Sequence, residues 1–370
     1  AILLNKSVNK LKAKNIFSKV ESTIKEGSEP NLKILEIDVE EKATGELMAG
    51  AGVGTDGTSF MGAVSENNWL GRGIKLKSSI NVSEEKVSGS IEVLNPNYNY
   101  SGNSVFGSFS LASSDFTESS GYETSSTGIS FGTEFEQYEN IYLAPSFSMK
   151  HERIEAEDSA SAQIKKMDGT FTNIDFGYAI TVDKRNQPFQ PTSGYRSKFL
   201  QELPILQDSS SLLNGYDLSS YRAFSENVTG ALKLHARSIH GIDEDVRITN
   251  RLFLPRKRLR GFNTARVGPK DGSDWVGGNY STAISLEALL PNLLPESTRT
   301  DVSVFLDSAN VWSVDYSDTV EDTNKIRSAF GISANVFTTI GPLTFTIAQD
   351  ISSASTDETE SFNFRLGTSF

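Results

Sequence analysis

Residues 173–183 read NIDFGYAITVD and alternate large apolar side chains with small or polar ones. Successive side chains of an extended strand point to opposite faces, so this period of two predicts a β-strand with one apolar face. That face consists of Ile174, Phe176, Tyr178, Ile180 and Val182. The stretch therefore predicts a strand that lies between an apolar and a polar environment.

The same alternation recurs at residues 280–290, 302–306 and 362–370. Counting all such runs gives about sixteen strands of roughly ten residues, the length with which a tilted strand crosses a bilayer. Short turns and longer polar loops are expected to alternate, as in a barrel with its turns on one side of a membrane. A large soluble β-sandwich is the alternative architecture. The long loops are expected at residues 151–169, 206–214, 241–279 and 313–325.

Composition excludes several classes of protein. No apolar run approaches the roughly 20 residues of a membrane-spanning helix. The net charge of -12 argues against a nucleic-acid binder, and the absence of cysteine excludes disulfides and thiolate chemistry. His151, His235 and His240 lack the spacing of a zinc site, so no metal or other cofactor is expected. Because no G-x-S-x-G, HExxH or histidine-centred triad is present either, no catalytic residue is assigned and no enzyme is predicted.

Residues 1–45 differ from the rest of the chain. A Lys-rich stretch at the N-terminus predicts an amphipathic helix of about four turns, and two short strands are expected at residues 20–25 and 32–40. A unit of this size is too small to bury a core of its own, so we interpret it as the end of a domain that begins upstream. The helix prediction depends on Leu11, Ile16, Phe17 and Val20.

The first and last strands of the predicted barrel are weaker than the others. The first, at residues 46–54, has one small apolar face and one face that is nearly all glycine, so few side chains contact its neighbours. The last strand ends the chain and must pair with the first if the barrel closes. We call this junction the seam and predict that it is the least stable junction of the barrel. Its candidate residues are Leu47, Gly50, Gly52, Gly54, Phe364, Gly367 and Phe370.

A second candidate site is Leu259-Arg260-Gly261-Phe262, which lies in a long polar segment between two alternating runs. Arg256, Lys257 and Arg258 precede Arg260 directly, and such a density of positive charge needs acidic partners or solvent. Gly261 permits a backbone conformation that is closed to other residues, and Phe262 provides a large apolar anchor. The segment is either a locked loop tip or an ordinary basic surface loop.

These motifs resemble those of the BamA family, whose members insert barrel proteins into the bacterial outer membrane. Leu259-Arg260-Gly261-Phe262 looks like the family's Val-Arg-Gly-Phe motif with Leu for Val, and Val267-Gly268-Pro269 follows as it does there. Phe305-Leu306-Asp307-Ser308-Ala309 looks like the family's Phe-x-Asp-x-Gly motif with Ala for Gly. Gly341-Pro342-Leu343 and the final aromatic residue are further similarities.

The resemblance implies an all-β fold, a sixteen-stranded antiparallel transmembrane β-barrel at residues 46–370. A partial α+β POTRA domain at residues 1–45 would precede it. By the alternation, Asp307 and Glu287 point into the lumen, and the resemblance implies that they pair with Arg260 there, beside Phe305. An Arg meets a carboxylate with two parallel hydrogen bonds.

The resemblance also implies a function without covalent chemistry. An insertase would bind unfolded barrel clients through their terminal strand at a lateral gate between the first and last strands, beside membrane lipid. Its barrel would lie in the bacterial outer membrane with the N-terminal part in the periplasm, where accessory assembly lipoproteins would bind the POTRA region. The alternative is a related protein-translocating barrel, either a two-partner secretion transporter or the paralogue for autotransporter assembly.

Overall fold

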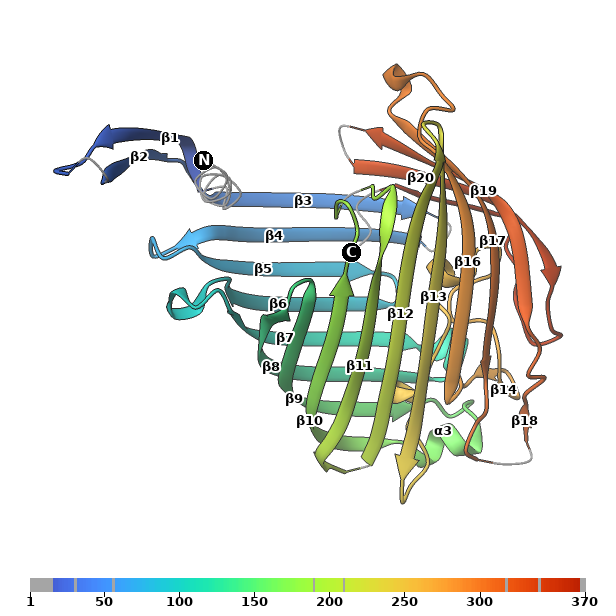
Figure 1. Ribbon diagram of the computed structural model, residues 1–370. Coiled ribbons are helices and arrows are strands. Elements are labelled where there is room, and N and C mark those ends of the chain that lie inside the picture. Colours follow the sequence, from blue (N-terminus) through green and yellow to red (C-terminus); the bar gives the residue numbers. More distant parts are fainter. Residues whose placement is uncertain are drawn as a thin grey trace.

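Among the described residues of the computed structural model, sixteen antiparallel strands close into a barrel (Figure 1). The structure describes residues 16–366 except 30–31, 55–56, 189, 209, 317–318 and 339–340. The number and direction of the strands confirm the predicted fold class. In chain order the strands are β3 (Gly45–Gly54), β4 (Gly57–Trp69), β5 (Ile74–Ser83), β6 (Lys86–Asn95), β7 (Ser104–Phe116), β8 (Tyr122–Tyr138), β9 (Ile141–Ala156), β10 (Gly169–Asp183), β11 (Ser193–Gln207), β12 (Ser210–Ser225), β13 (Val228–Ile242), β16 (Tyr280–Leu290), β17 (Thr300–Trp312), β19 (Arg327–Thr338), β20 (Gly341–Ser352) and β21 (Phe362–Leu366).

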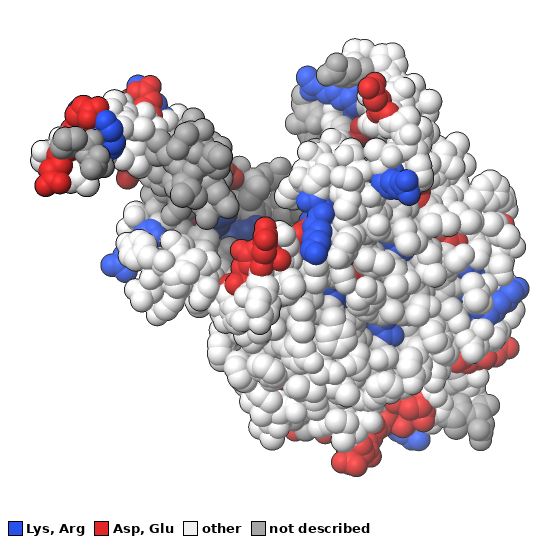
Figure 2. All heavy atoms as spheres, viewed as in Figure 1, with Lys and Arg blue, Asp and Glu red and all other residues white. Residues whose placement is uncertain are grey.

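The outer face of the wall is apolar and the inner face is largely polar. On β17, Val304 and Leu306 are exposed, whereas the alternating residues Phe305 and Asp307 are buried inside the barrel. On the face seen in Figure 2, the wall carries few charged side chains across its middle. Aromatic rings contact one another across several strands on the outside, with centroids 5.1 to 6.3 Å apart. An apolar exterior around a polar interior is typical of a transmembrane β-barrel and excludes a soluble sandwich.

The predicted alternation of short and long connections is only partly correct. The long loop expected at residues 206–214 is not present, because β11 ends only at Gln207 and β12 already begins at Ser210. At the opposite end of the barrel, residues 184–192 and 291–299 form further long connections, so the long connections are not confined to one end. Polar residues at strand ends read as loop in a sequence, although a strand can extend beyond the bilayer into water.

Several short elements lie in the connections. They are η1 (Tyr98–Tyr100), α2 (Thr117–Ser120), α3 (Ala162–Lys166), η2 (Ile248–Asn250), η3 (Arg256–Arg258) and η4 (Glu296–Thr298). A small sheet with the order β15-β14-β18 joins two connections at one end of the barrel. It consists of β14 (Lys270–Asp271), β15 (Asp274–Trp275) and β18 (Val320–Glu321). None of the helices among the described residues has the length and apolar character that a membrane-spanning helix needs.

The N-terminal part forms a separate two-stranded sheet of β1 (Phe17–Glu26) and β2 (Lys33–Glu41), beside the end of the barrel where β3 begins (Figure 1). Phe17 and Val20 were assigned to the predicted helix, but both belong to β1, where Val20 pairs with Val39. Their apolar spacing fits a strand as well as a helix in so short a segment. Residues 1–15 of the predicted helix lie outside the described residues.

β3 has two neighbours in the barrel, β4 on one side and β21 across the seam, and the structure describes fewer register pairs with β21. β3 pairs with β4 along its whole length, so its glycine face does not interrupt the backbone ladder on that side. Backbone groups make the ladder, and glycine supplies them as well as any residue. On the other side, the described residues give two register pairs with β21, Arg365 with Gly54 and Leu366 with Val53. Within the described part of the barrel, every other neighbouring strand pair has at least the five register pairs of β20 and β21. Gly367 and Phe370 lie outside the described residues.

The two faces of β9 provide a test of the inside-out arrangement. Phe147 faces outward with 40% of its surface exposed, whereas Ser148 points into the lumen. We expect Phe147→Arg to lower the free energy of unfolding in bilayers by up to about 4 kcal/mol, the cost of an arginine at the bilayer midplane. Ser148→Arg places the same side chain in water and should change it by no more than about 0.5 kcal/mol. Urea titration in lipid vesicles measures both, and equal losses would contradict the assignment of the faces.

Candidate functional site

The connection between β13 and β16, residues 243–279, folds back into the barrel. It bonds to the wall on several strands that are spread around the circumference. Arg247 Nη2 donates to Asn173 Oδ1 on β10 at 2.6 Å, and Thr249 Oγ1 donates to Glu152 Oε2 on β9 at 2.7 Å. Further contacts described below reach β12, β16, β17, β19 and β20. The connection, which we call the lumen loop, therefore crosses the interior rather than extending from the rim.

Arg260 of the lumen loop is held by Asp307 on β17. Its Nε and Nη2 atoms donate to the two carboxylate oxygens at 2.7 and 2.8 Å, so the contact is bidentate. The backbone N–H of Arg260 donates to the same carboxylate at 3.1 Å. The side chain of Asp307 is 1% exposed and that of Arg260 is 14% exposed. Water therefore screens the pair little, and the forked geometry fixes the orientation of the Arg as well as its position.

Glu287 on β16 is the second carboxylate at this site. It accepts from Arg260 Nη2 at 2.7 Å and also from Lys233 Nζ at 2.6 Å. Ser285 adds an Oγ acceptor for Arg260 Nη2 at 2.9 Å. Two cations thus face two carboxylates, which leaves this cluster without net charge. The two carboxylates are not equivalent, because Asp307 takes three bonds from Arg260 whereas Glu287 divides its charge between two cations.

Phe305 lies beneath the guanidinium group. The Cζ atom of Arg260 lies 3.6 Å from the ring centroid, and the Phe305 side chain is almost completely buried. The negative face of an aromatic ring attracts a cation, and the attraction is stronger where water is excluded. The Phe305 ring therefore stabilises the positive charge of Arg260 on the face of the guanidinium group that the carboxylates do not contact.

Gly261 brings the loop backbone directly against the wall. Its φ of +90° is in the left-handed region, and an added Cβ would lie 3.1 Å from Ala348 Cβ and 3.2 Å from Ala329 Cβ. Both alanines are buried on the inner faces of β20 and β19. The close approach thus requires small residues on both sides, which is a feature of the wall that the sequence reading did not identify.

Leu259 and Phe262 on either side of this contact are each 1% exposed. They belong to a buried apolar cluster inside the barrel. Such burial excludes the alternative of an ordinary basic surface loop for this segment. The cluster consists of Leu254, Leu259, Phe262, Val267, Ala283, Ala309, Val311 and Ala329.

The remaining basic residues of the motif have different surroundings. Arg256 pairs with Glu360 at 2.7 Å, and Arg258 Nη2 contacts Asp217 on β12 at 3.2 Å. Lys257 is exposed. The acidic partners of Arg256 and Arg258 come from distant parts of the chain, so spacing in the sequence could not reveal them. Among the described residues, no three His, Asp or Glu side chains gather as a metal ion would require.

The seam residues lie apart from this site in the chain but are joined to it by the connection between β20 and β21. Glu360 N donates to Gly261 O at 2.9 Å, and Phe262 forms an isolated β-bridge with Thr359. This contact brings the tip of the lumen loop within two residues of the start of β21. Sequence reasoning missed the connection, because its polar residues look like any exposed loop.

The unequal sharing of Arg260 leads to a prediction. Asp307→Asn should cost about 3–5 kcal/mol of loop docking, because it breaks a buried pair. Glu287→Gln should cost about 1.5–3 kcal/mol, the range for one charged hydrogen bond. Limited proteolysis of the lumen loop at increasing denaturant concentration measures the docking. If Glu287→Gln were the more damaging change, Asp307 would not be the principal partner.

The contribution of the close packing at Gly261 to loop docking can be measured separately from the contribution of its backbone conformation. Gly272 in the same loop also has a positive φ, +63°, but a Cβ there meets nothing within 4 Å. Gly272→Ala should therefore cost only the conformational term of about 1–2 kcal/mol. Gly261→Ala should cost about 1–3 kcal/mol more, because its Cβ overpacks the wall. The same proteolysis assay compares the two, and equal losses would remove the packing explanation.

Comparison with known proteins places the fold among outer-membrane barrels. The chain is 25% identical over 355 residues to the outer membrane protein assembly factor BamA of Neorickettsia risticii (strain Illinois), an alignment that covers 91% of this chain and 46% of the relative. BamA of Neisseria meningitidis serogroup B is 23% identical over 396 residues, covering 92% of this chain and 49% of that protein. The chain thus spans about half the length of these curated relatives.

Solved structures show the same architecture. The crystal structure of BamA from Haemophilus ducreyi lacking POTRA domains 1–3 matches with a TM-score of 0.84 and 20% identity, over 99% of this chain and 78% of that chain. CdiB from Acinetobacter baumannii matches with a TM-score of 0.62 and 12% identity, over 97% and 67%. The BamA relatives and the apolar exterior place the barrel in the bacterial outer membrane. The family model for the Omp85 superfamily domain matches residues 68–370, and the chain therefore belongs to the Omp85 superfamily.

Proposed function

We propose that this chain is the barrel part of an assembly factor that inserts β-barrel proteins into the outer membrane. The observation that carries the proposal is the closure of the barrel by its first and last strands, β3 and β21, in a chain similar to two BamA assembly factors. Strand edges bind other strands through backbone hydrogen bonds, without regard to their side chains. Because β3 and β21 are the first and last strands of the barrel, no hairpin joins them, and their parting would expose two strand edges to a client strand.

The mechanism requires no covalent step. The seam between β3 and β21 acts as a lateral gate, whose residues include Leu47, Gly50, Gly52, Phe364 and Gly367. When the gate opens, the terminal strand of an unfolded client pairs with an exposed edge, and further client strands follow by hairpin pairing. Each new backbone hydrogen bond forms at the edge of membrane lipid, so that no polar backbone group has to enter the bilayer unpaired.

The site around Arg260 supports this function by holding the lumen loop. A loop docked in the lumen obstructs a transport path through the barrel and leaves the lateral route as the available one. The motif residues Leu259, Arg260, Gly261 and Phe262 and their wall partners Phe305, Asp307 and Glu287 therefore position the loop and touch no client. The rival function is export of a protein through the lumen, which would require this loop to leave.

The N-terminal sheet of β1 and β2 is proposed to be the end of a POTRA domain within residues 1–45, located in the periplasm. One face of this sheet carries exposed apolar side chains, including Ile24, Leu35, Ile37 and Val39. The rest of a domain would cover such a face. Accessory assembly lipoproteins are proposed to bind this region, upstream of the barrel.

A disulfide across the seam tests the gate. The chain has no cysteine, so Val53→Cys and Leu366→Cys, which are register partners, have no competing thiol. The oxidised protein should remain folded and lose client insertion, and reduction should restore it. Leu218→Cys with Leu234→Cys, register partners on β12 and β13, is the matched control and should be harmless. Insertion at the parental rate with the seam locked would refute lateral opening and favour export through the lumen.

A further inference from the structure

Residues 353–361, which we call the final connection, lead from β20 into the last strand β21. The backbone of the final connection forms hydrogen bonds with several residues of the lumen loop. Glu358 N donates to Arg266 O at 3.0 Å and Glu358 O accepts from Asn263 N at 2.9 Å. Trp275 Nε1 donates to Thr356 O at 2.9 Å. The start of β21 is thus reached from inside the barrel rather than from a free surface loop.

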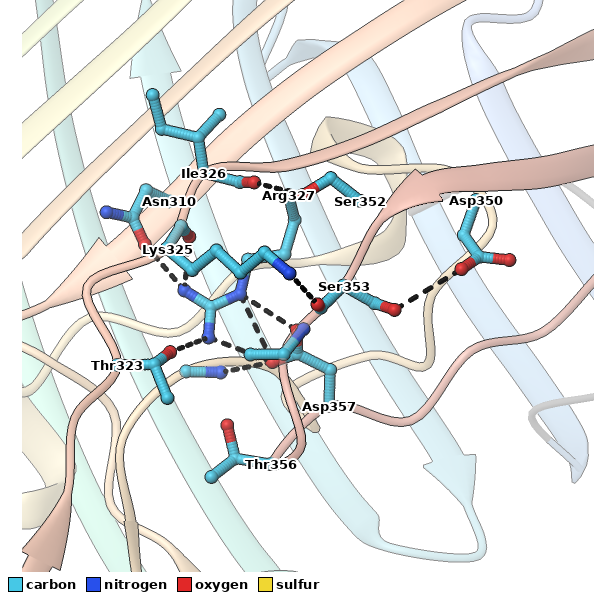
Figure 3. A network of polar contacts seen from close by, with 12 residues as sticks. Asn310, Thr323, Lys325, Ile326, Arg327, Asp350, Ser352, Ser353, Thr356 and Asp357 are labelled. Atoms are coloured by element: carbon cyan, nitrogen blue, oxygen red, sulfur yellow. Dashed lines mark hydrogen bonds and ion pairs between the residues drawn. The ribbon is translucent and has the colours of Figure 1, made fainter.

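One buried carboxylate, Asp357, joins the final connection to two other segments (Figure 3). Its oxygens accept from Arg327 Nε at 2.9 Å and from Arg327 Nη2 at 3.0 Å. They also accept from the backbone N–H of Gly268 in the lumen loop at 3.1 Å and from that of Ala354 at 2.6 Å. The Asp357 side chain is 0% exposed and that of Arg327 is 1% exposed. All of these bonds therefore lie out of reach of water.

Arg327, at the first position of β19, is bonded on its other sides as well. Its Nη1 atom donates to Asn310 Oδ1 on β17 at 2.6 Å and to Lys325 O at 2.7 Å, and Nη2 contacts Thr323 Oγ1 at 3.4 Å. Figure 3 shows these partners around the guanidinium group. The Arg is thus held in place by β17 and by the connection before β19. Asp357 is the one of its partners that belongs to the final connection.

This arrangement ties the chain down just ahead of β21. The described part of β21 itself has five register pairs with β20 and two with β3. At Asp357, five residues before the first residue of β21, the chain is tied to the buried cation Arg327. Undocking the final connection would leave that cation in the interior without its counter-charge, and breaking a buried pair in this way is strongly destabilising.

We propose that Arg327 and Asp357 are positioning residues that pin the start of β21 to the lumen loop, so that movement at the seam pivots about this point. That β21 is a gate strand rests on the proposed function. The pinning itself is a property of the barrel alone. It makes the final connection the fixed end and the β3 side the moving end.

Spin labels test the pinning in the folded barrel without any client. Phe362→Cys on β21 and Phe330→Cys on β19 are both exposed on the outer face and take the only labels in this cysteine-free chain. The two sites are separated by one intervening strand, about 10 Å, so the parent should give a single short distance, measured by the dipolar broadening of the continuous-wave electron paramagnetic resonance spectrum. Asp357→Asn, which keeps the size of the side chain but not its charge, should add a second, longer distance population.

Glu358→Gln is the matched control. It makes the same change at the next residue, where the carboxylate is 40% exposed and lies 3.4 Å from Arg266. This variant should keep the single distance of the parent. A second population of the same size in the control, or none in Asp357→Asn, would overturn the proposal.

A double variant separates positioning from the simple cost of an unpaired charge. Arg327→Met with Asp357→Leu removes both charges, and apolar replacement of a buried pair usually preserves stability. We expect a folded barrel that still shows the second distance population, because the bonds of Asp357 to Gly268 and Ala354 are lost. If the double variant returned to the single distance, the pair would serve only to satisfy its own charges. This variant also decides the question if Asp357→Asn fails to fold.

The result is independent of insertion activity. Loss of pinning with normal insertion would leave the proposed function intact. Conversely, a pinned strand in a barrel that inserts nothing would refute the proposed function and leave the assignment of Arg327 and Asp357 standing.

Discussion

The need to neutralise buried positive charge governs the interior of this barrel. The lumen loop carries several of its cations away from bulk water, and each buried one must meet a carboxylate or a carbonyl there. Arg260 meets Asp307 and Glu287, Arg256 meets Glu360, and the wall cation Arg327 meets Asp357. These pairs determine where the loop can lie, since a shift of a few ångströms would leave several charges unpaired at once.

Small and apolar residues stabilise the docked loop tip together with the charge pairs. Gly261 approaches the wall at Ala329 and Ala348, and Phe262 enters an apolar cluster just beyond it. Charge pairing gives direction to the loop tip, whereas the close packing excludes water and thereby strengthens the pairing. The two effects depend on each other, so neither alone explains why the loop remains inside.

The barrel wall itself depends on backbone hydrogen bonds, and these differ in number around the ring. β3 is fully paired with β4 although it is rich in glycine, while its described register with β21 is short. The glycine face of β3 therefore does not prevent a full backbone ladder with β4. On the other side of the seam, the final connection, docked on the lumen loop, leads the chain into β21.

The sequence by itself determined the class of fold and the motif at the loop tip. Alternation with a period of two is a local property, since neighbouring side chains of one strand face opposite media, and so it could be read from residues 173–183 onward. It also placed Asp307 and Phe305 on the inner face of their strand. The strand ends and Phe17 were misread because polar or short apolar segments carry no decisive period.

Only the tertiary structure decided which distant residues meet. Asp357 and Arg327 are 30 residues apart, and Arg260 and Asp307 are 47 residues apart. No spacing rule links such pairs, because the closure of the barrel and the path of the lumen loop bring them together. The same holds for Ala329 and Ala348. Their small size is explained only by the backbone of the lumen loop, which lies against them at Gly261. Local periodicity indicates which face of a strand is apolar and which is polar. The contact partners of a side chain, in contrast, depend on how the whole chain closes into the barrel.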